Sequence, residues 1–238
     1  MNSFDGSIIS FLNGFAHRSW TLDTFVYLLT VNSLLKAGVI SAALWWAWFR
    51  RGESRTENRE FILYGLIACC LAVFLARGLA LMLPFRERPL RNPALHFQLP
   101  YSMSATSLLA WSSFPSDHAA LFFALGTTLL FVCRRTGIFA LSYVFFAICL
   151  PRIYLGIHYP TDILVGALIG IGTASLSKIA AIRTATTRPA MRWLHRHPGS
   201  FYTCFFLLTY QIASVFFDLR EIGRFFSTTV KALVKLLR

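Results

Sequence analysis

Residues 138–181 read IFALSYVFFAICLPRIYLGIHYPTDILVGALIGIGTASLSKIAA, and this stretch decides the fold. It consists of two apolar runs, 138–157 and 161–181, which meet at a short polar segment around His158 and Asp162. A helix of about 20 apolar residues spans the roughly 30 Å hydrocarbon core of a bilayer. The stretch therefore predicts two consecutive membrane-spanning helices, joined by a turn that carries ionisable side chains at one membrane face.

The composition of the whole chain supports a membrane protein. The 238 residues are 56% hydrophobic and 14% charged, with a mean hydropathy of +0.58, whereas soluble domains are about one quarter charged. Four further apolar stretches have lengths that suit a span: 24–49, 61–85, 117–133 and 200–217. We therefore predict an all-α fold, a polytopic membrane helix bundle of about six transmembrane helices that forms one domain over residues 1–238.

The basic residues indicate how this bundle is oriented. They are concentrated after the first, third and fifth predicted spans, at Arg50, Arg51, Arg55, Arg59, Arg134, Arg135, Lys178, Arg183, Arg188, Arg192 and Arg196. Because Lys and Arg are retained on the cytoplasmic side, the other connections and both termini are predicted to lie outside. The net charge of +13 therefore reflects topology, and without a basic–aromatic surface away from the membrane flanks we expect no nucleic-acid partner.

Both ends of the chain have the pattern of helices that lie in the membrane interface. Apolar residues recur at helical spacing within residues 3–17, at Phe4, Ile8, Phe11 and Phe15. Near the other end, basic residues share one helical face, namely Arg224, Lys231, Lys235 and Arg238. These patterns predict interfacial helices that contact membrane lipids. A solvated charged tail is the alternative for the second.

A cluster of arginines follows the second predicted span. Residues 85–91 read FRERPLR, and Arg86, Arg88 and Arg91 lie on the outer side, against the positive-inside bias. The guanidinium group is a planar fork of donors that matches phosphate oxygens and keeps its charge. This cluster favours a phosphate-binding site, and an Arg–Glu network that anchors the loop is the alternative.

A second polar cluster opens the third predicted span. Residues 113–118 read SFPSDH, in which Ser116 or Asp117 fits an N-cap and His118 follows inside the helix. The first turn of a helix has unpaired N–H groups and a positive dipole end, so it binds anions. The pattern favours a site where His118 protonates a leaving oxygen, although a lone histidine there is more often structural.

A third cluster joins the fourth and fifth predicted spans. Arg152 is followed by His158 and, four residues later, by Asp162. A carboxylate at this distance holds one imidazole nitrogen and makes the other a better nucleophile. An N-cap Asp beside an interfacial His is the alternative. All three clusters are predicted on the same outer face, and this coincidence favours a catalytic site.

The residues of the three clusters together suit phosphoryl transfer. This reaction depends mainly on positioning and on charge neutralisation, and the clusters offer arginines, a helix start and two histidines. A zinc site made of His118, His158 and Asp162 is the competing interpretation. The surplus of arginines would repel a cation, so we expect neither a metal nor another cofactor.

These residues resemble the type 2 phosphatidic acid phosphatase family, membrane relatives of vanadium haloperoxidases. That family carries the motifs Lys-x6-Arg-Pro, Pro-Ser-Gly-His and Ser-Arg-x5-His-x3-Asp. The matching residues lie in a motif region over residues 77–166, and they are Arg88-Pro89, Pro115-Ser116-Asp117-His118, and Arg152 with His158 and Asp162.

The resemblance implies a role for each matched residue. His158 would attack phosphorus and form a phosphohistidine, Asp162 would orient it, and His118 would protonate the leaving group. The phosphate oxygens would be held by a set of donors consisting of Arg88, Arg152, Ser116 and backbone amides near Asp117.

Three positions depart from the family motifs. The lysine position is occupied by Leu81, the serine position by Pro151 and the glycine position by Asp117. Arg77 lies one helical turn before Leu81 on the same face, and Arg86 lies just before Arg88. Either arginine is a candidate for the missing phosphate-binding cation.

The Pro-Ser-Asp-His variant, preceded by Ser-Phe, resembles a bacterial subgroup that acts on undecaprenyl diphosphate. It implies a metal-independent lipid phosphatase in the inner membrane, with its active site facing the periplasm and a polyprenyl-phosphate or phospholipid substrate. Alternatives are a phosphatidylglycerophosphate, phosphatidate or lipid A phosphatase, a lipid phosphotransferase, and a transporter or scaffold with a degenerate site. The sequence gives no protein partner.

Overall fold

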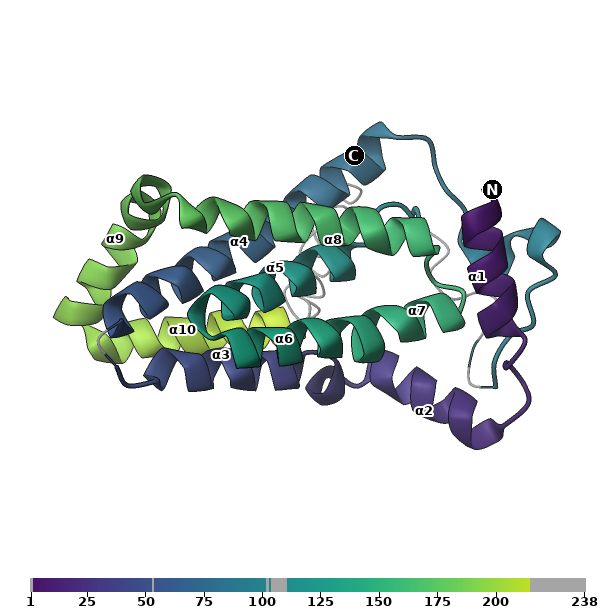
Figure 1. The fold of residues 1–238 in the computed structure, drawn as a ribbon, viewed down its shortest axis with the longest axis horizontal. Helices are drawn as coiled ribbons and strands as arrows, with labels where there is room; N and C mark the ends of the chain where they lie inside the picture. Colours follow the sequence, from purple (N-terminus) through teal and green to yellow (C-terminus); the bar gives the residue numbers. More distant parts are fainter. Residues whose placement is uncertain (1, 53, 102, 104–110, 215–238) are drawn as a thin grey trace, which may run out of the picture.

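The computed structural model describes residues 2–52, 54–101, 103 and 111–214 (Figure 1). Within these residues the regular secondary structure is helical, which confirms the predicted all-α class. The helices are α1 (Ser3–Asn13), α2 (Trp20–Val31), α3 (Val39–Phe49), α4 (Arg55–Met82), α5 (Asp117–Val132), α6 (Arg134–Tyr143), α7 (Leu150–Tyr154), α8 (Pro160–Ser175), α9 (Ala180–Arg196) and α10 (Pro198–Ala213). Short 3-10 or π segments are η1 (Leu34–Gly38), η2 (Pro89–Arg91), η3 (Pro93–Leu95), η4 (Val144–Cys149) and η5 (Leu176–Lys178).

The centre of the bundle is α5, which packs against α4, α6 and α8 (Figure 1). Its fully buried side chains include Leu121, Phe122 and Leu129. Two glycines bring α8 against the α5 backbone. A Cβ at Gly166 would lie 2.4 Å from the carbonyl oxygen of Ser116, and one at Gly170 would lie 2.3 Å from that of Ala120. Hence α5 and α8 run in the same direction, and their N-terminal ends lie at the same end of the bundle.

Helices occupy all six segments predicted to span the membrane. Only some of these helices are both long enough and apolar enough to cross it. In the described residues the qualifying helices are Arg55–Met82, Arg134–Tyr154 and Pro160–Lys178, and α2 with α3 makes a fourth if the bent pair is one span. Both α5 and α10 have 16 residues, or about 24 Å. Six spans therefore stay a prediction. Most of the α5 side chains are buried against the neighbouring helices.

Two of the long apolar segments are interrupted by π-helical turns. The segment η1 separates α2 from α3, which are bent by 65°, and η4 separates α6 from α7. The hydroxyl of Tyr143 donates a hydrogen bond to the carbonyl oxygen of Leu35, so the two interruptions are joined. Turns of this kind occur frequently at functional sites.

The N-terminal helix α1 lies across one end of the bundle (Figure 1). It forms within the segment predicted as interfacial and contacts α7 and α8. Its Asp5 side chain is fully buried, so one face of α1 packs on protein. The predicted basic helix near the C-terminus lies outside the described residues, and its membrane role stays a prediction.

Candidate active site

The turn between α7 and α8 folds back on Arg152. The backbone N–H groups of Ile157 and His158 donate to the Arg152 carbonyl oxygen at 2.9 and 3.2 Å. Gly156 adopts a φ of +66°, and a Cβ there would lie 2.7 Å from the ring of Phe97. Glycine is therefore required both for the left-handed backbone and for the close approach. The result is a tight turn that holds His158 in the protein interior, with 4% of its surface exposed.

The imidazole of His158 is held by a backbone group of a distant segment. Its Nδ1 lies 2.8 Å from the carbonyl oxygen of Ser113. Because a carbonyl oxygen only accepts hydrogen bonds, Nδ1 carries the proton and Nε2 of the neutral ring carries a lone pair. Burial lowers the pKa of His158, and the positive charges of Arg88 and Arg152 lower it further, against the opposing effect of Asp162. The neutral, nucleophilic form is therefore favoured.

The carboxylate of Asp162 is fully buried and acts on His158 mainly through other groups. Its nearest oxygen lies 3.6 Å from Nδ1 of His158, whereas the Ser113 carbonyl oxygen lies 2.8 Å from the same atom. Its Oδ2 accepts hydrogen bonds from the Ser113 hydroxyl and, at 2.8 Å, from the N–H of Tyr159. Asp162 thus fixes Ser113, whose carbonyl oxygen in turn orients the imidazole. The sequence pattern indicated the pairing but not this intermediate residue.

Arg86, a predicted phosphate ligand, is engaged by two carboxylates. Its guanidinium group pairs with Asp162 at 2.6 Å and with Asp5 at 2.7 Å. It also lies 4.0 Å over the ring of Tyr159. This geometry favours a role for Arg86 in positioning other groups. Direct phosphate binding by Arg86 stays a prediction.

Asp5, which no sequence motif singled out, belongs to the same network. Its carboxylate accepts hydrogen bonds from the N–H and the hydroxyl of Thr161, at 2.9 and 2.7 Å. One sequence signal could have identified Asp5. It lies four residues before Ile9 and therefore on the same helical face, and a carboxylate on a buried face needs a partner. Asp5 ties α1 to the start of α8.

Arg88 and Arg152 have a different environment from Arg86. Both are buried, with 7% and 5% of their surfaces exposed. Arg88 donates to the carbonyl oxygen of Ile157 at 2.7 Å. Among the described residues, no acceptor pairs with the buried Nε atom of either arginine. Burial lowers the pKa of Arg88 to about 10, so its charge is retained at neutral pH. Both guanidinium groups therefore suit a bound oxyanion.

The start of α5 completes the site. The hydroxyl of Ser116 accepts a hydrogen bond from the N–H of Ala119 at 3.3 Å, so Ser116 is the N-cap. The N–H of Ser116 donates to the carbonyl oxygen of Asp162 at 3.1 Å. This contact joins the second and third motif segments, and it places the positive ends of α5 and α8 side by side, an arrangement that favours anion binding.

Asp117 holds His118 at this helix start. Its Oδ1 atom lies 2.8 Å from Nδ1 of His118 and 2.8 Å from the His118 backbone nitrogen. A carboxylate accepts from Nδ1, so Nε2 is the nitrogen that a proton on the ring would offer to a ligand. Asp117 also pairs with Arg77, which lies 4.5 Å over the ring of Trp111. Arg77 therefore neutralises the residue that replaces the motif glycine, and its predicted phosphate contact stays a prediction.

The side chain at the motif lysine position is directed away from this network. Leu81 is 83% exposed, as expected for a residue that faces lipid. In the described residues, no group of three or more His, Cys, Asp or Glu side chains is arranged to hold a metal ion.

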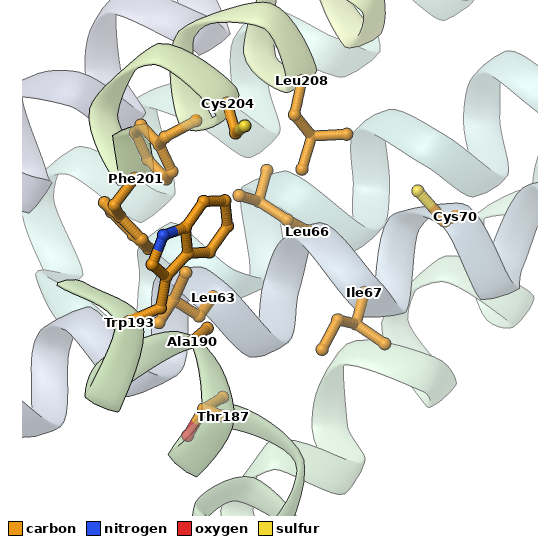
Figure 2. Close-up of a pocket in the computed structure, with 11 residues that line it drawn as sticks. Leu63, Leu66, Ile67, Cys70, Thr187, Ala190, Trp193, Phe201, Cys204 and Leu208 are labelled. Atoms are coloured by element: carbon orange, nitrogen blue, oxygen red, sulfur yellow. The ribbon is translucent and has the colours of Figure 1, made fainter. Parts of the chain in front are cut away.

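An apolar pocket of about 360 Å³ lies between α4, α9 and α10, away from the motif residues. Figure 2 shows the indole of Trp193 beside Phe201 and Leu63 in this pocket. Among the described residues that line it, none belongs to the predicted site. Since α9 is at the opposite end of the bundle from α1 (Figure 1), the pocket and the polar network are separate features.

Comparison with known proteins agrees with the motif assignment. Residues 84–186 match the family model described as PAP2 superfamily. The chain is 29% identical over 145 residues to the bacitracin transport permease protein BcrC of Bacillus licheniformis, covering 59% of this chain and 62% of that protein. It is 27% identical over 168 residues to the undecaprenyl-diphosphatase BcrC of Bacillus subtilis (strain 168), covering 69% and 77%.

No solved structure gave a significant match to the chain. The matched segment contains the arginine–proline pair, the Pro-Ser-x-His segment and the His–Asp turn. The resemblance inferred from these motifs is thereby confirmed, because residues 84–186 of this chain match the PAP2 superfamily model.

Proposed function

We propose that this protein is a membrane lipid phosphatase that removes the terminal phosphate of a polyprenyl diphosphate, with undecaprenyl diphosphate as the preferred substrate. The observation that carries the proposal is the environment of His158. Its Nδ1 proton is fixed by the Ser113 carbonyl oxygen at 2.8 Å, so the Nε2 lone pair is the nucleophile, and the buried guanidinium groups of Arg88 and Arg152 act on the same imidazole.

In the first step, the Nε2 lone pair of His158 attacks the terminal phosphorus. The bond between this phosphorus and the bridging oxygen breaks, and the electron pair stays on that oxygen. His118 donates its Nε2 proton to the oxygen, so the products are a phosphohistidine and a lipid monophosphate. Arg88 and Arg152 neutralise the charge on the transferring phosphoryl group.

In the second step, a water molecule attacks the phosphohistidine. The neutral His118 now accepts a proton from the water while the N–P bond breaks and its electron pair returns to His158. Inorganic phosphate leaves, and both histidines are restored to their starting protonation states. The same residue acts first as acid and then as base.

The substrate assignment has two supports. The Bacillus subtilis relative is named an undecaprenyl-diphosphatase, and this chain has the Ser-Phe-Pro-Ser-Asp-His segment that resembles the same bacterial subgroup. The site lies at the opposite end of the predicted topology from the basic connections after the first, third and fifth spans. Because those connections are predicted to be cytoplasmic, we propose an inner-membrane location with the site facing the periplasm.

The test is phosphate release by the detergent-purified protein in the presence of EDTA. Undecaprenyl diphosphate, phosphatidylglycerophosphate and phosphatidate are compared, each with wild type and His158→Ala. We expect release that depends on His158, survives EDTA and is fastest with the diphosphate. Loss of activity in EDTA, restored by a divalent metal, would refute metal independence. A faster phosphatidate reaction would reassign the substrate.

One relative carries a transport name, the bacitracin transport permease protein of Bacillus licheniformis. This favours transport as the second candidate function. A transporter requires no phosphoryl transfer, so His158→Ala would leave bacitracin resistance in cells intact. A phosphatase predicts that the same variant loses both phosphate release and any resistance that the wild type confers.

A further inference from the structure

Arg77, a candidate for the missing phosphate-binding cation, lies beside the residue that holds His118. It precedes Leu81, the residue at the motif lysine position, by one helical turn of α4. Because α4 packs against α5, the Arg77 guanidinium group reaches the first turn of α5 and pairs with Asp117 there. The cation that could replace the motif lysine is therefore bound to the residue that replaces the motif glycine.

The carboxylate of Asp117 joins Arg77 to His118. Its Oδ2 atom pairs with Arg77, and its Oδ1 atom lies 2.8 Å from Nδ1 of the His118 ring and 2.8 Å from the His118 backbone nitrogen. The terminal torsion of an aspartate is broad, so a carboxylate with one free oxygen rotates easily. A contact that fixes Oδ2 also fixes the direction of Oδ1, because the group is planar. The orientation of the imidazole thus depends on Arg77 through Asp117.

Arg77 has a second partner that keeps its guanidinium group in place. The group lies 4.5 Å over the ring of Trp111, a distance at which the ring face attracts a cation. The Arg77 side chain is 34% exposed and that of Asp117 is 15% exposed. Salt screens a partly buried pair of this kind less than a surface pair. Arg77 is therefore a fixed support for the carboxylate.

The two arginines of the motifs differ from Arg77 in what their donors contact. Arg88 donates to a backbone carbonyl oxygen, that of Ile157. Among the residues that the structure describes, the buried Nε atoms of Arg88 and Arg152 have no hydrogen-bond acceptor. These guanidinium groups retain donors for an oxyanion, whereas that of Arg77 is bound to a carboxylate. The geometry separates cations that suit the phosphate from one that supports the proposed acid.

We propose that Arg77 is a positioning residue for the proton donor, and that it orients the His118 imidazole toward the leaving oxygen through Asp117. The inference rests on the proposed function, in which His118 is the acid. Arg77 then contributes to the rate only where the leaving oxygen needs a proton. A ligand of the transferred phosphate would instead stabilise the phosphoryl group whatever the leaving group is.

The experiment measures kcat/KM with farnesyl monophosphate, whose leaving oxygen needs a proton, and with p-nitrophenyl phosphate, whose leaving oxygen does not. For Arg77→Met we expect a loss of about 10-fold with the first substrate and below about 3-fold with the second, less than for misplacement of a catalytic group itself. Arg77→Lys keeps the charge and should restore most of the rate. Arg55→Met removes an exposed arginine from the other end of α4. It is the matched control and should change neither reaction.

A double-mutant cycle tests whether Arg77 acts through Asp117. Asp117→Asn removes the charge with which Arg77 pairs. Adding Arg77→Met to Asp117→Asn should therefore lower the rate with farnesyl monophosphate by less than about 2-fold further. A ligand of the phosphate acts independently of Asp117, so the two losses would multiply, and that outcome would overturn the proposal.

The leaving-group comparison can overturn the proposal as well. Equal losses in Arg77→Met with the two substrates, or no loss with either, would do so. If Arg77→Met does not fold, as judged by its melting temperature in detergent, Arg77→Gln provides the same comparison with a polar side chain.

His118→Ala is the reference that separates this inference from the proposed function. If His118→Ala loses the same factor with both substrates, the proposed acid role of His118 fails and the inference fails with it. Leaving-group dependence in His118→Ala but not in Arg77→Met overturns the inference alone.

Discussion

The two histidines of the site are held in different ways. His158 is oriented by the carbonyl oxygen of Ser113, a residue 45 positions away in the sequence, and Asp162 stabilises that arrangement through the Ser113 hydroxyl. His118 is oriented by Asp117, its immediate neighbour. The proposed nucleophile, His158, therefore depends on the docking of two motif segments, whereas the proposed proton donor, His118, is positioned within a single helical turn.

The largest expected effect separates the roles of the two histidines. His158→Ala removes the nucleophile and should lower kcat on the order of 10³-fold or more with every substrate. His118→Ala removes a general acid, which contributes about 10²–10⁴-fold, and its effect should shrink when the leaving group needs no proton. Rates with farnesyl monophosphate and p-nitrophenyl phosphate provide the measurement. Equal losses with both substrates would contradict the assignment of His118 as acid.

The next effect tests the long-range support of His158. Asp162→Asn removes the charge that pairs with Arg86 and weakens the bond to Ser113, so the imidazole shifts. A misplacement of this kind costs about 10²-fold in kcat. Asp117→Asn should cost less, because the amide oxygen still accepts from Nδ1 of His118. Steady-state kcat for the two variants gives the comparison, and a larger loss in Asp117→Asn would reverse it.

A smaller effect is expected at the N-terminal helix. Asp5→Asn weakens the pairing with Arg86 and the contact with Thr161 without touching the substrate. We expect kcat to fall about 10-fold, less than for direct misplacement of a catalytic group, with little change in KM. Ser7→Ala, on the exposed face of α1, is the control. Unchanged kinetics in Asp5→Asn would show that Arg86 needs only Asp162.

The smallest effect is a displacement of the pH profile. In the proposed mechanism the neutral form of His158 is the reactive one, and burial together with Arg88 and Arg152 lowers the pKa of His158 below the ordinary value of 6.5. On the acid side, kcat/KM should therefore fall only below about pH 6.5. Asp162 opposes this lowering, so Asp162→Asn should move the acid limb to still lower pH. A shift to higher pH would contradict the charge assignment.

Much of the site was predictable because the motif spacings are local. The six-residue step from Arg152 to His158 and the four-residue step to Asp162 fall within one turn and one helix start, so spacing alone implies proximity. The positions of the apolar helices were equally accessible, since apolar runs between basic segments mark them, whereas α9 lies within a basic segment and was not predicted as a helix. The number of membrane spans stays a prediction, because α5 and α10 have only 16 residues each.

Arg86 and Arg88 show which part of the site could not be predicted from the sequence. Arg86 and Arg88 are two residues apart, and both offered a charge to phosphate. One pairs with Asp5, 81 positions away, and the other turns to the Ile157 carbonyl oxygen. Which guanidinium meets a carboxylate is decided by packing between distant helices, so composition and spacing carry no information about it.

The contact between Asp5 and Thr161 also has a consequence for biosynthesis. These residues are 156 positions apart, and chains are synthesised at about 5–20 residues per second. Roughly 8–30 s therefore pass between the synthesis of Asp5 and the synthesis of its partner Thr161 on α8. The nascent chain cannot form this contact until α8 has been synthesised, so α1 reaches its final position late although it is made before α8.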